Sequence, residues 1–159
     1  MSTTTKENTA EAFGVTPVNK VKRVHERGRY DKKSVYAILD AALVCHIAYV
    51  IDGRPYCTPT SFWREGDHLY WHGSSASRMI KMTKEGVPVC LTVTHLDALV
   101  MARSGFHHSV NYRAVMAFGT AHFIEDPAEN MTTEPASLHS FSFLVEPFPD
   151  HYPPLSIFM

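Results

Sequence analysis

The stretch LVCHIAYVIDGRPYCTPTSFW, residues 43–63, contains the clearest structural signal in the chain. Leu43–Ile51 is β-branched and aliphatic, and Tyr56–Trp63 returns to residue types that favour strands. Asp52-Gly53 between them is typical of a two-residue hairpin turn. The stretch therefore predicts two antiparallel strands joined by a tight turn.

Short extended segments separated by turn residues continue after this hairpin. Glu65-Gly66-Asp67 is a second turn, and His68–His72 is a third strand that stops at Gly73. The remaining extended segments are Val89–Val93, Leu96–Ala102 and Val110–Glu125, the last with Gly119 as a point where it could bend or bulge. Five or six strands with short connections favour a barrel.

Two short helices are expected beside these strands. Apolar residues recur at helical spacing before the hairpin, with Asp31 or Ser34 as the cap: Val35, Ile38, Leu39 and Ala42. Ser74–Ser77 supplies caps for a second helix from Arg78 to Thr83, which Gly86-Val87-Pro88 ends. The predicted fold is mainly β with short flanking helices.

Bulk composition limits the classes of protein to consider. A chain of 159 residues suits one domain, and a net charge of −1 provides no broad positive field for a nucleic acid or an acidic membrane. We expect no membrane span, because no apolar run reaches the required length. Cys45, Cys57 and Cys90 are an odd number of distant cysteines, which favours reduced thiols and a cytoplasmic location.

The two ends of the chain differ in character from the middle. Residues 1–19 begin with a polar, Thr-rich segment, Met1–Thr16, that predicts a disordered arm outside the core. Residues 20–126 form the predicted barrel domain. Residues 127–159 form a Pro- and aromatic-rich tail, in which we expect five prolines to prevent a regular helix or a central strand: Pro135, Pro147, Pro149, Pro153 and Pro154.

The most informative polar stretch runs from Leu69 to Arg78. A strand leads through His72, Gly73 and Ser74 to a predicted helix start with Ser77 and Arg78. Free N–H groups at a helix start, serine hydroxyls and a guanidinium together favour a phosphate. A second interpretation is that the serines only cap the helix and Arg78 lies on its solvated face.

A second polar stretch runs from Ala102 to Arg113, with two arginines, two histidines, an amide and a phenol in a loop that leads to a strand. It is either a binding loop or a polar hairpin end with surface ion pairs. The ten histidines show no metal-ligand spacing, and we assign no metal site; His46, His95 and His122 lie in strand contexts that favour core or edge roles. The sequence has no nucleophile elbow, Walker loop or dinucleotide fingerprint.

Several blocks in order over residues 23–126 resemble the flavin-nucleotide-binding branch related to pyridoxamine 5′-phosphate oxidase, close to the nitroimidazole-resistance proteins. These blocks are Arg29-Tyr30-Asp31, Ile38-Leu39-Asp40, His46, Arg54-Pro55-Tyr56 with Pro59-Thr60, Leu69–Ser74 with Ser77-Arg78, and Asn111-Tyr112-Arg113 with Phe118-Gly119. The resemblance implies a six-stranded antiparallel FMN-binding split barrel of Greek-key type that pairs as a homodimer, with FMN at the interface.

The resemblance also implies the residues of the site. One subunit would contribute Thr58, Pro59, Thr60, Ser61, His72, Gly73, Ser74, Ser77 and Arg78, and the facing subunit would contribute Arg103, Ser109, Asn111, Tyr112 and Arg113. His72 matches a histidine that nitroimidazole-resistance relatives place beside the cofactor and is the catalytic candidate. The tail after Asp126 departs from the family pattern.

Four functions remain open from the sequence. The first is an FMN-dependent oxidoreductase that passes electrons from a reduced donor to a small acceptor. The others are a flavin-storage protein without turnover, a truncated relative that binds no cofactor, and a haem-binding or haem-degrading protein. Pyridoxamine-phosphate oxidation itself is not expected, because the basic cluster of the true oxidases is absent near the carboxyl end.

Overall fold

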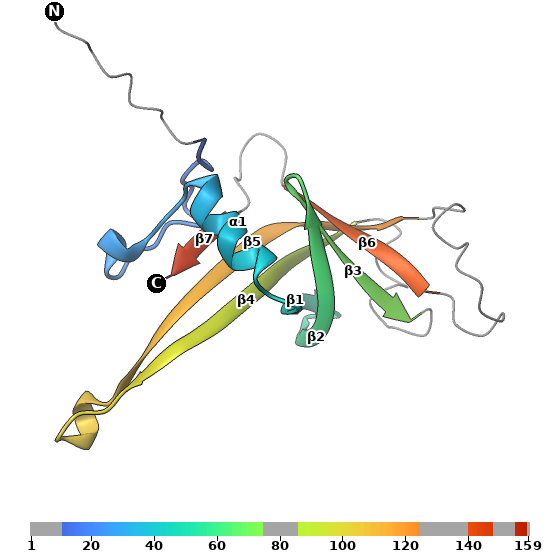
Figure 1. Cartoon of the computed structure of the whole chain (residues 1–159). Coiled ribbons are helices and arrows are strands. Elements are labelled where there is room, and N and C mark those ends of the chain that lie inside the picture. Colours follow the sequence, from blue (N-terminus) through green and yellow to red (C-terminus); the bar gives the residue numbers. More distant parts are fainter. Residues whose placement is uncertain (1–10, 75–85, 125–139, 148–154, 159) are drawn as a thin grey trace, which may run out of the picture.

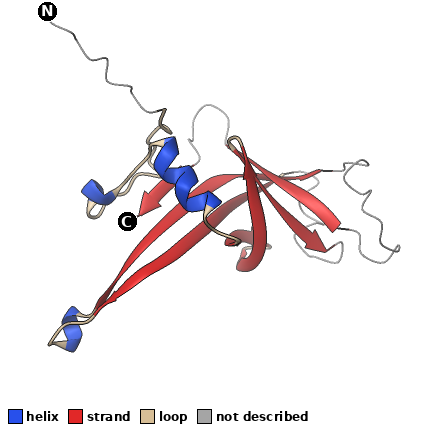
Figure 2. Cartoon of the chain, viewed as in Figure 1, coloured by secondary structure: helices blue, strands red, loops and turns tan. Residues whose placement is uncertain are grey.

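A computed structural model describes the chain over residues 11–74, 86–124, 140–147 and 155–158. Strands dominate these residues and the helices are short (Figures 1 and 2). In chain order the elements are η1 (His25–Arg27), α1 (Lys32–Asp40), β1 (Val44–Ile51), β2 (Arg54–Glu65), β3 (His68–Ser74), β4 (Val87–Val100), η2 (Gly105–His107), β5 (Ser109–Ile124), β6 (Ser140–Pro147) and β7 (Leu155–Phe158).

The seven strands form one antiparallel sheet with the order β4-β1-β2-β3-β6-β5-β7. β5 also pairs with β4, so the pairing of six strands returns to the strand at which it begins. The order β4-β1-β2-β3 is a Greek key, because the fourth strand returns to lie beside the first. The predicted mainly β split-barrel fold is confirmed, with β7 on β5 as a seventh strand where six were expected.

The hairpin predicted from residues 43–63 is confirmed as β1 and β2. Ile51 pairs with Arg54 across the turn, and both turn residues have positive φ, 49° for Asp52 and 72° for Gly53. Two successive positive φ values define the tight turn that matches the twist of neighbouring strands, and glycine adopts them without steric cost. Aspartate is among the residue types that tolerate this region best.

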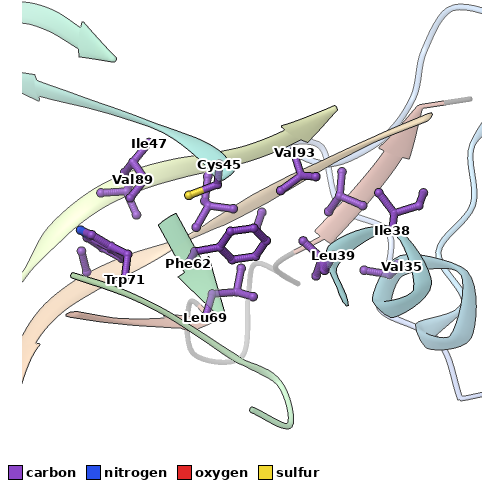
Figure 3. Packing of buried hydrophobic residues seen from close by; sticks show 14 of the residues in the cluster. Val35, Ile38, Leu39, Cys45, Ile47, Phe62, Leu69, Trp71, Val89 and Val93 are labelled. Carbon is purple, nitrogen blue, oxygen red and sulfur yellow. The ribbon is translucent and has the colours of Figure 1, made fainter. Parts of the chain in front are cut away.

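The predicted amphipathic helix is confirmed as α1, which packs on the barrel through Val35, Ile38 and Leu39 (Figure 3). Its N-cap is Asp31, whose carboxylate accepts a hydrogen bond from the Ser34 amide at 2.8 Å. This contact satisfies one of the amides that a helix start leaves without an intrahelical partner.

The core lies inside the barrel and under α1. Alternate residues are buried in β1, as for Cys45 and Ile47, and in the first half of β4, as for Val89 and Val93 (Figure 3). Aromatic rings of Phe62 in β2 and Trp71 in β3 join the same cluster, together with Leu69. The alternation shows that one face of the sheet forms the core, as expected for a barrel of this size.

β4 is one continuous strand, although the sequence predicted two separate segments in this region. A single register shift lies between Leu96 and Ala98, and pairing with β5 continues on both sides of it. No bulge lies at Gly119, because Val89 faces Gly119 in regular register. The register shift between Leu96 and Ala98 leaves Asp97 as an extra residue in β4.

The expectation that prolines exclude a central strand from residues 127–159 is wrong for β6. β6 lies between β3 and β5 and pairs with both. Ser140–Glu146 contains no proline, so every residue in this run can donate a ladder hydrogen bond. Pro147 is the last residue of the strand, where a missing amide hydrogen costs least.

The amino-terminal segment also differs from its prediction, because Phe13 belongs to the core. Its amide donates to Tyr30 O at 2.8 Å, which ties the segment to the residue before the α1 cap. Asn19 is buried; its side chain accepts from the Thr16 amide at 2.7 Å and donates to Gly14 O at 2.9 Å. Residues 11–19 are thus attached by specific contacts, whereas residues 1–10 lie outside the described part.

A cluster of charged side chains joins this segment, α1 and the β2–β3 turn. Lys32 Nζ lies 2.7 Å from Glu11 Oε1 and 3.0 Å from Asp67 Oδ2. The Tyr36 hydroxyl donates to Asp67, and this contact, followed by the one with Lys32, lowers the pKa of Asp67 from its usual 3.8. Asp67 is therefore the acceptor on which two side chains of α1 converge.

Replacing Asp67 with Asn should reduce the free energy of unfolding at neutral pH by about 1 kcal/mol, the upper range for ion pairs screened by solvent. Because the folded-state pKa lies below 3.8, this contribution is present above that pH and disappears as the pH falls through the folded-state pKa. Urea unfolding at about pH 7 and about pH 2.5 measures the difference between variant and wild type. A difference that stays constant between the two pH values would contradict this role, and Asp52→Asn serves as the control.

Candidate functional site

The four β2 residues predicted to border a flavin ring lie on two different faces of the sheet. Thr58 faces Ile47 and Thr60 faces Cys45, and both of these partners are buried. Cross-strand partners share a face, so these threonines lie on the core side of β2. The Thr58 hydroxyl lies 3.0 Å from the Tyr49 hydroxyl.

Pro59 and Ser61 lie on the outer face of β2, opposite His46 and Val44 of β1. Successive residues of a strand point to opposite faces, so one ligand cannot contact all four predicted side chains from one side of the sheet. Phe62 pairs with Trp71, and the next residue along β3 is His72. Ser61 and His72, which the sequence assigned to one site, are thus at neighbouring positions of adjacent strands.

The end of β3 contains the first part of the predicted phosphate site. His72, Gly73 and Ser74 pair with Ser142, Phe141 and Ser140 of β6. The prediction that the strand stops at Gly73 is wrong, because β6 extends the ladder as far as Ser74. Ser77, Arg78 and the predicted helix from Arg78 to Thr83 lie outside the described residues, so the phosphate site stays a prediction.

The second group of predicted residues lies on a two-stranded arm, which we define as residues 95–113. β4 and β5 continue past the barrel and are joined through η2, so the arm projects as a ribbon without further strands (Figure 1). Arg103 is exposed near the tip. The His108 ring accepts a hydrogen bond from the Ala102 amide at 3.0 Å, which holds the tip together.

The arm has one polar face, made mostly by alternate residues of β5. Ser109, Asn111 and Arg113 are two residues apart in a strand of regular register, so they point the same way. Their cross-strand partners are Val100, Ala98 and His95. Three of the predicted site residues are therefore in one row, and this row presents hydrogen-bond donors.

The opposite face of the arm is apolar and exposed. Leu96 pairs with Tyr112 and Leu99 pairs with Val110, and all four are exposed, from 39% for Tyr112 to 65% for Leu99. Phe106 at the tip is 92% exposed. The predicted site residue Tyr112 thus lies on the other side from Arg113.

Sequence reasoning missed this apolar face. The residues that make it, Leu96, Leu99, Val110 and Tyr112, do not show the alternation of a half-buried strand, because a bulge interrupts β4. The available signal was the high apolar content of Leu96–Met101 beside a strand that ends in a polar loop. An isolated hairpin of this kind has little stability by itself in water.

Arg113, predicted as a ligand-binding arginine, forms a bidentate ion pair with Asp97. Arg113 Nε lies 2.9 Å from Asp97 Oδ2 and Arg113 Nη2 lies 2.9 Å from Asp97 Oδ1. The guanidinium lowers the pKa of Asp97, and the carboxylate raises the pKa of Arg113. Both side chains are about two-fifths exposed.

The two groups of predicted residues are not brought together within one chain. The arm points away from the barrel, and the end of β3 lies on the other side of the molecule (Figure 1). The resemblance assigned these groups to facing subunits, and a single chain does not test that assignment.

The described histidines differ in their contacts. The His95 ring bonds to Ile38 O at 3.0 Å and so satisfies a carbonyl near the end of α1, in agreement with its predicted structural role. His46 is exposed on the outer face of β1 and makes no hydrogen bond, ion pair or ring contact with the described residues.

Within the described ranges, no three His, Cys, Asp or Glu residues are grouped as metal ligands. None of the helices described is both long enough and apolar enough to span a membrane.

Comparison with known proteins identifies the class to which this barrel and arm belong. The family model for pyridoxamine 5′-phosphate oxidase matches residues 31–142. The chain therefore belongs to the pyridoxamine 5′-phosphate oxidase family, as its sequence blocks indicated. A search of the curated proteins found no significant match.

Several solved structures share the fold. The flavocytochrome Anf3 from Azotobacter vinelandii is 35% identical, with a TM-score of 0.73, 91% of this chain covered and 74% of that one. The FAD and haem binding protein from Mycobacterium smegmatis is 28% identical, with a TM-score of 0.69 and coverage of 84% and 73%. A protein described as a 5-nitroimidazole antibiotic resistance protein, from Bacteroides thetaiotaomicron, is 24% identical, with a TM-score of 0.59 and coverage of 80% and 84%.

Proposed function

We propose that this protein binds a flavin, with FMN as the expected form, and passes electrons through it from a reduced donor to a small-molecule acceptor. The observation that carries the proposal is the 35% identity to a flavocytochrome over 91% of this chain. Family membership over residues 31–142 supports the same cofactor class. The flavin would supply the electron-accepting chemistry, and the protein would bind and orient it.

The polar face of the arm fits the edge of a flavin. Asn111 and Arg113 donate hydrogen bonds, and the pyrimidine edge and ribityl chain of a flavin accept them. Ser109 adds a hydroxyl in the same row. A guanidinium beside the ring also favours the reduced form, which carries more negative charge. His72, Ser74 and Arg78 remain the proposed contacts for the other edge and the phosphate.

We place this flavin between two copies of the chain. The polar face of the arm and the end of β3 lie apart in one chain, so a site that uses both needs a second copy (Figure 1). The apolar face of the arm supplies a reason for pairing, because burying Leu96, Leu99 and Val110 removes exposed apolar area from water. A two-fold arrangement would form two equivalent sites.

Haem binding is a second candidate function. Flavocytochrome Anf3 and the Mycobacterium smegmatis protein, which are 35% and 28% identical to this chain, have names that include a cytochrome or haem. An axial ligand requires a histidine whose ring nitrogen is available, and His46 meets this condition among the described residues. Its neighbours Pro59 and Val44 give this part of the outer face an apolar character.

Titration of the purified protein with FMN and with FAD, followed by flavin fluorescence, tests the main proposal. We expect binding, and we expect Arg113→Ala to weaken it about tenfold, the value of a hydrogen bond from a charged group. Arg64→Ala is the control, because Arg64 forms a similar bidentate pair with Asp40 outside the candidate site. Wild-type protein that binds neither flavin would overturn the proposal. In a second step the bound flavin is reduced and mixed with trial acceptors, and its absorbance reports reoxidation. Bound flavin that stays reduced with every acceptor offered would assign storage rather than turnover.

Light scattering during size-exclusion chromatography tests the pairing of two copies. We expect the wild type to elute as a dimer and Leu99→Asp to elute as a monomer, because a carboxylate in an apolar interface loses its hydration without a partner. Val15→Asp places the same charge on an exposed valine of the amino-terminal segment and should leave the mass unchanged. A monomeric wild type, or a dimeric Leu99→Asp, would exclude this interface.

Absorbance after addition of haem tests the second candidate. We expect a Soret band that His46→Ala removes or shifts, because the variant has no axial imidazole at that position. His25→Ala removes an exposed histidine in η1, outside the strands of the barrel, and should leave the band as in wild type. A band that is identical in wild type and His46→Ala would exclude this ligand.

A further inference from the structure

Asp97 is the one residue at which the β4–β5 ladder departs from regular register. Leu96 pairs with Tyr112 and Ala98 pairs with Asn111, which leaves Asp97 as an additional residue in β4. A bulge of this type turns a side chain in a direction that the regular strand does not allow, and bulges are common beside binding sites. Here the residue that it turns is a carboxylate.

The bulge also explains how the arm keeps two faces of different character. Leu96 and Leu99 are three residues apart, so in a regular strand they would point to opposite faces. The extra residue between them changes the alternation and brings both leucines to the apolar face, opposite Tyr112 and Val110. Asp97 meets Arg113 on the other face as a consequence.

Arg113 and Arg64 show what is particular about this ion pair. Each guanidinium uses Nε and Nη2 on a carboxylate, Asp97 for Arg113 and Asp40 for Arg64. Arg64 also donates from Nη1 to Gly66 O at 2.7 Å, and its Cζ lies 3.9 Å from the centre of the Tyr36 ring. Arg64 is therefore engaged on every side.

The Nη1 group of Arg113, in contrast, donates to no atom in the described part of the chain. Asp97 occupies one edge of the guanidinium and leaves the other edge open, on the polar face with Asn111 and Ser109. A guanidinium is planar and rigid, so fixing one edge also fixes the direction of the other. The arm thus presents an oriented donor.

We propose that Asp97 is a positioning residue that holds Arg113 with its free Nη1 edge toward an acceptor of the bound flavin. This inference rests on the proposed flavin function. Asp97 itself does not contact the ligand. It restricts the rotamers of a long side chain before the ligand arrives, which reduces the entropy lost on binding.

The sign of the effect separates positioning from simple charge. Asp97→Asn removes a negative charge beside the site, and charge alone would tighten the binding of an electron-rich ligand and raise the flavin reduction potential. Loss of positioning acts in the opposite direction. It weakens binding and lowers the potential, because the guanidinium no longer stays beside the reduced ring.

The test measures the dissociation constant and the midpoint potential of the flavin-bound protein for wild type, Asp97→Asn, Arg113→Ala and the double variant. We expect Asp97→Asn to weaken binding about fivefold, within the range for one hydrogen bond, and to lower the potential. In the Arg113→Ala background the same change should have no further effect, because Asp97 acts through Arg113. Asp40→Asn, which breaks the matched Arg64 pair, should change neither quantity.

Three results would overturn the inference. They are tighter flavin binding by Asp97→Asn, an unchanged potential, or an effect of equal size in the Arg113→Ala background. Thermal unfolding and elution mass of Asp97→Asn show whether the arm still folds and pairs, and a loss of either would assign Asp97 a structural role instead. Failure of the wild type to bind flavin would reject the proposed function, which is a different outcome from normal binding by Asp97→Asn.

Discussion

The pairing of β4 with β5 is the constraint on which the rest of the structure depends. It runs from Val87 with Ala121 at one end to Val100 with Ser109 at the other. Its first half joins β5 to β4 and so completes the ring of paired strands, which leaves those two strands without a free edge inside the barrel. Its second half continues past the barrel as the arm. One ladder therefore serves both the core and the candidate site, and residues change from buried to exposed along it.

The arm shows how one irregular residue organises a surface. A regular ribbon would place Leu96 and Leu99 on opposite faces, and each face would then mix apolar and polar groups. The bulge at Asp97 separates them, with leucines on one side and Arg113 on the other. Such separation matters because an apolar face can associate with another protein surface while the polar face stays available to a ligand. Family membership and the likeness to flavocytochrome Anf3 are the comparisons that support the proposed flavin ligand.

Local features were predicted well where one short-range interaction decides them. The Asp52-Gly53 turn, the Asp31 cap and the apolar stripe of α1 all depend on residues within a few positions of each other. Predictions failed where a distant segment decides the outcome. β6 is a central strand because its proline-free run pairs with β3 on one side and β5 on the other. Phe13 is buried because its ring packs in the core cluster, which is built from residues far from it in the sequence. Of the candidate site, the residue types were predicted, but the row of Ser109, Asn111 and Arg113 and the pair with Asp97 depend on strand register.

The sequence alone determined the class of this protein: a mainly β barrel, its first hairpin, its capped helix and its family, because turn chemistry, alternation and ordered blocks are properties of neighbouring residues. Only the tertiary structure decided which side chains share a face. That depends on the pairing register of strands far apart in the chain, and a single extra residue reverses the face of everything that follows it. The bulge at Asp97 is this kind of feature, since no local pattern of residues 95–100 specifies it and the pairing with β5 does.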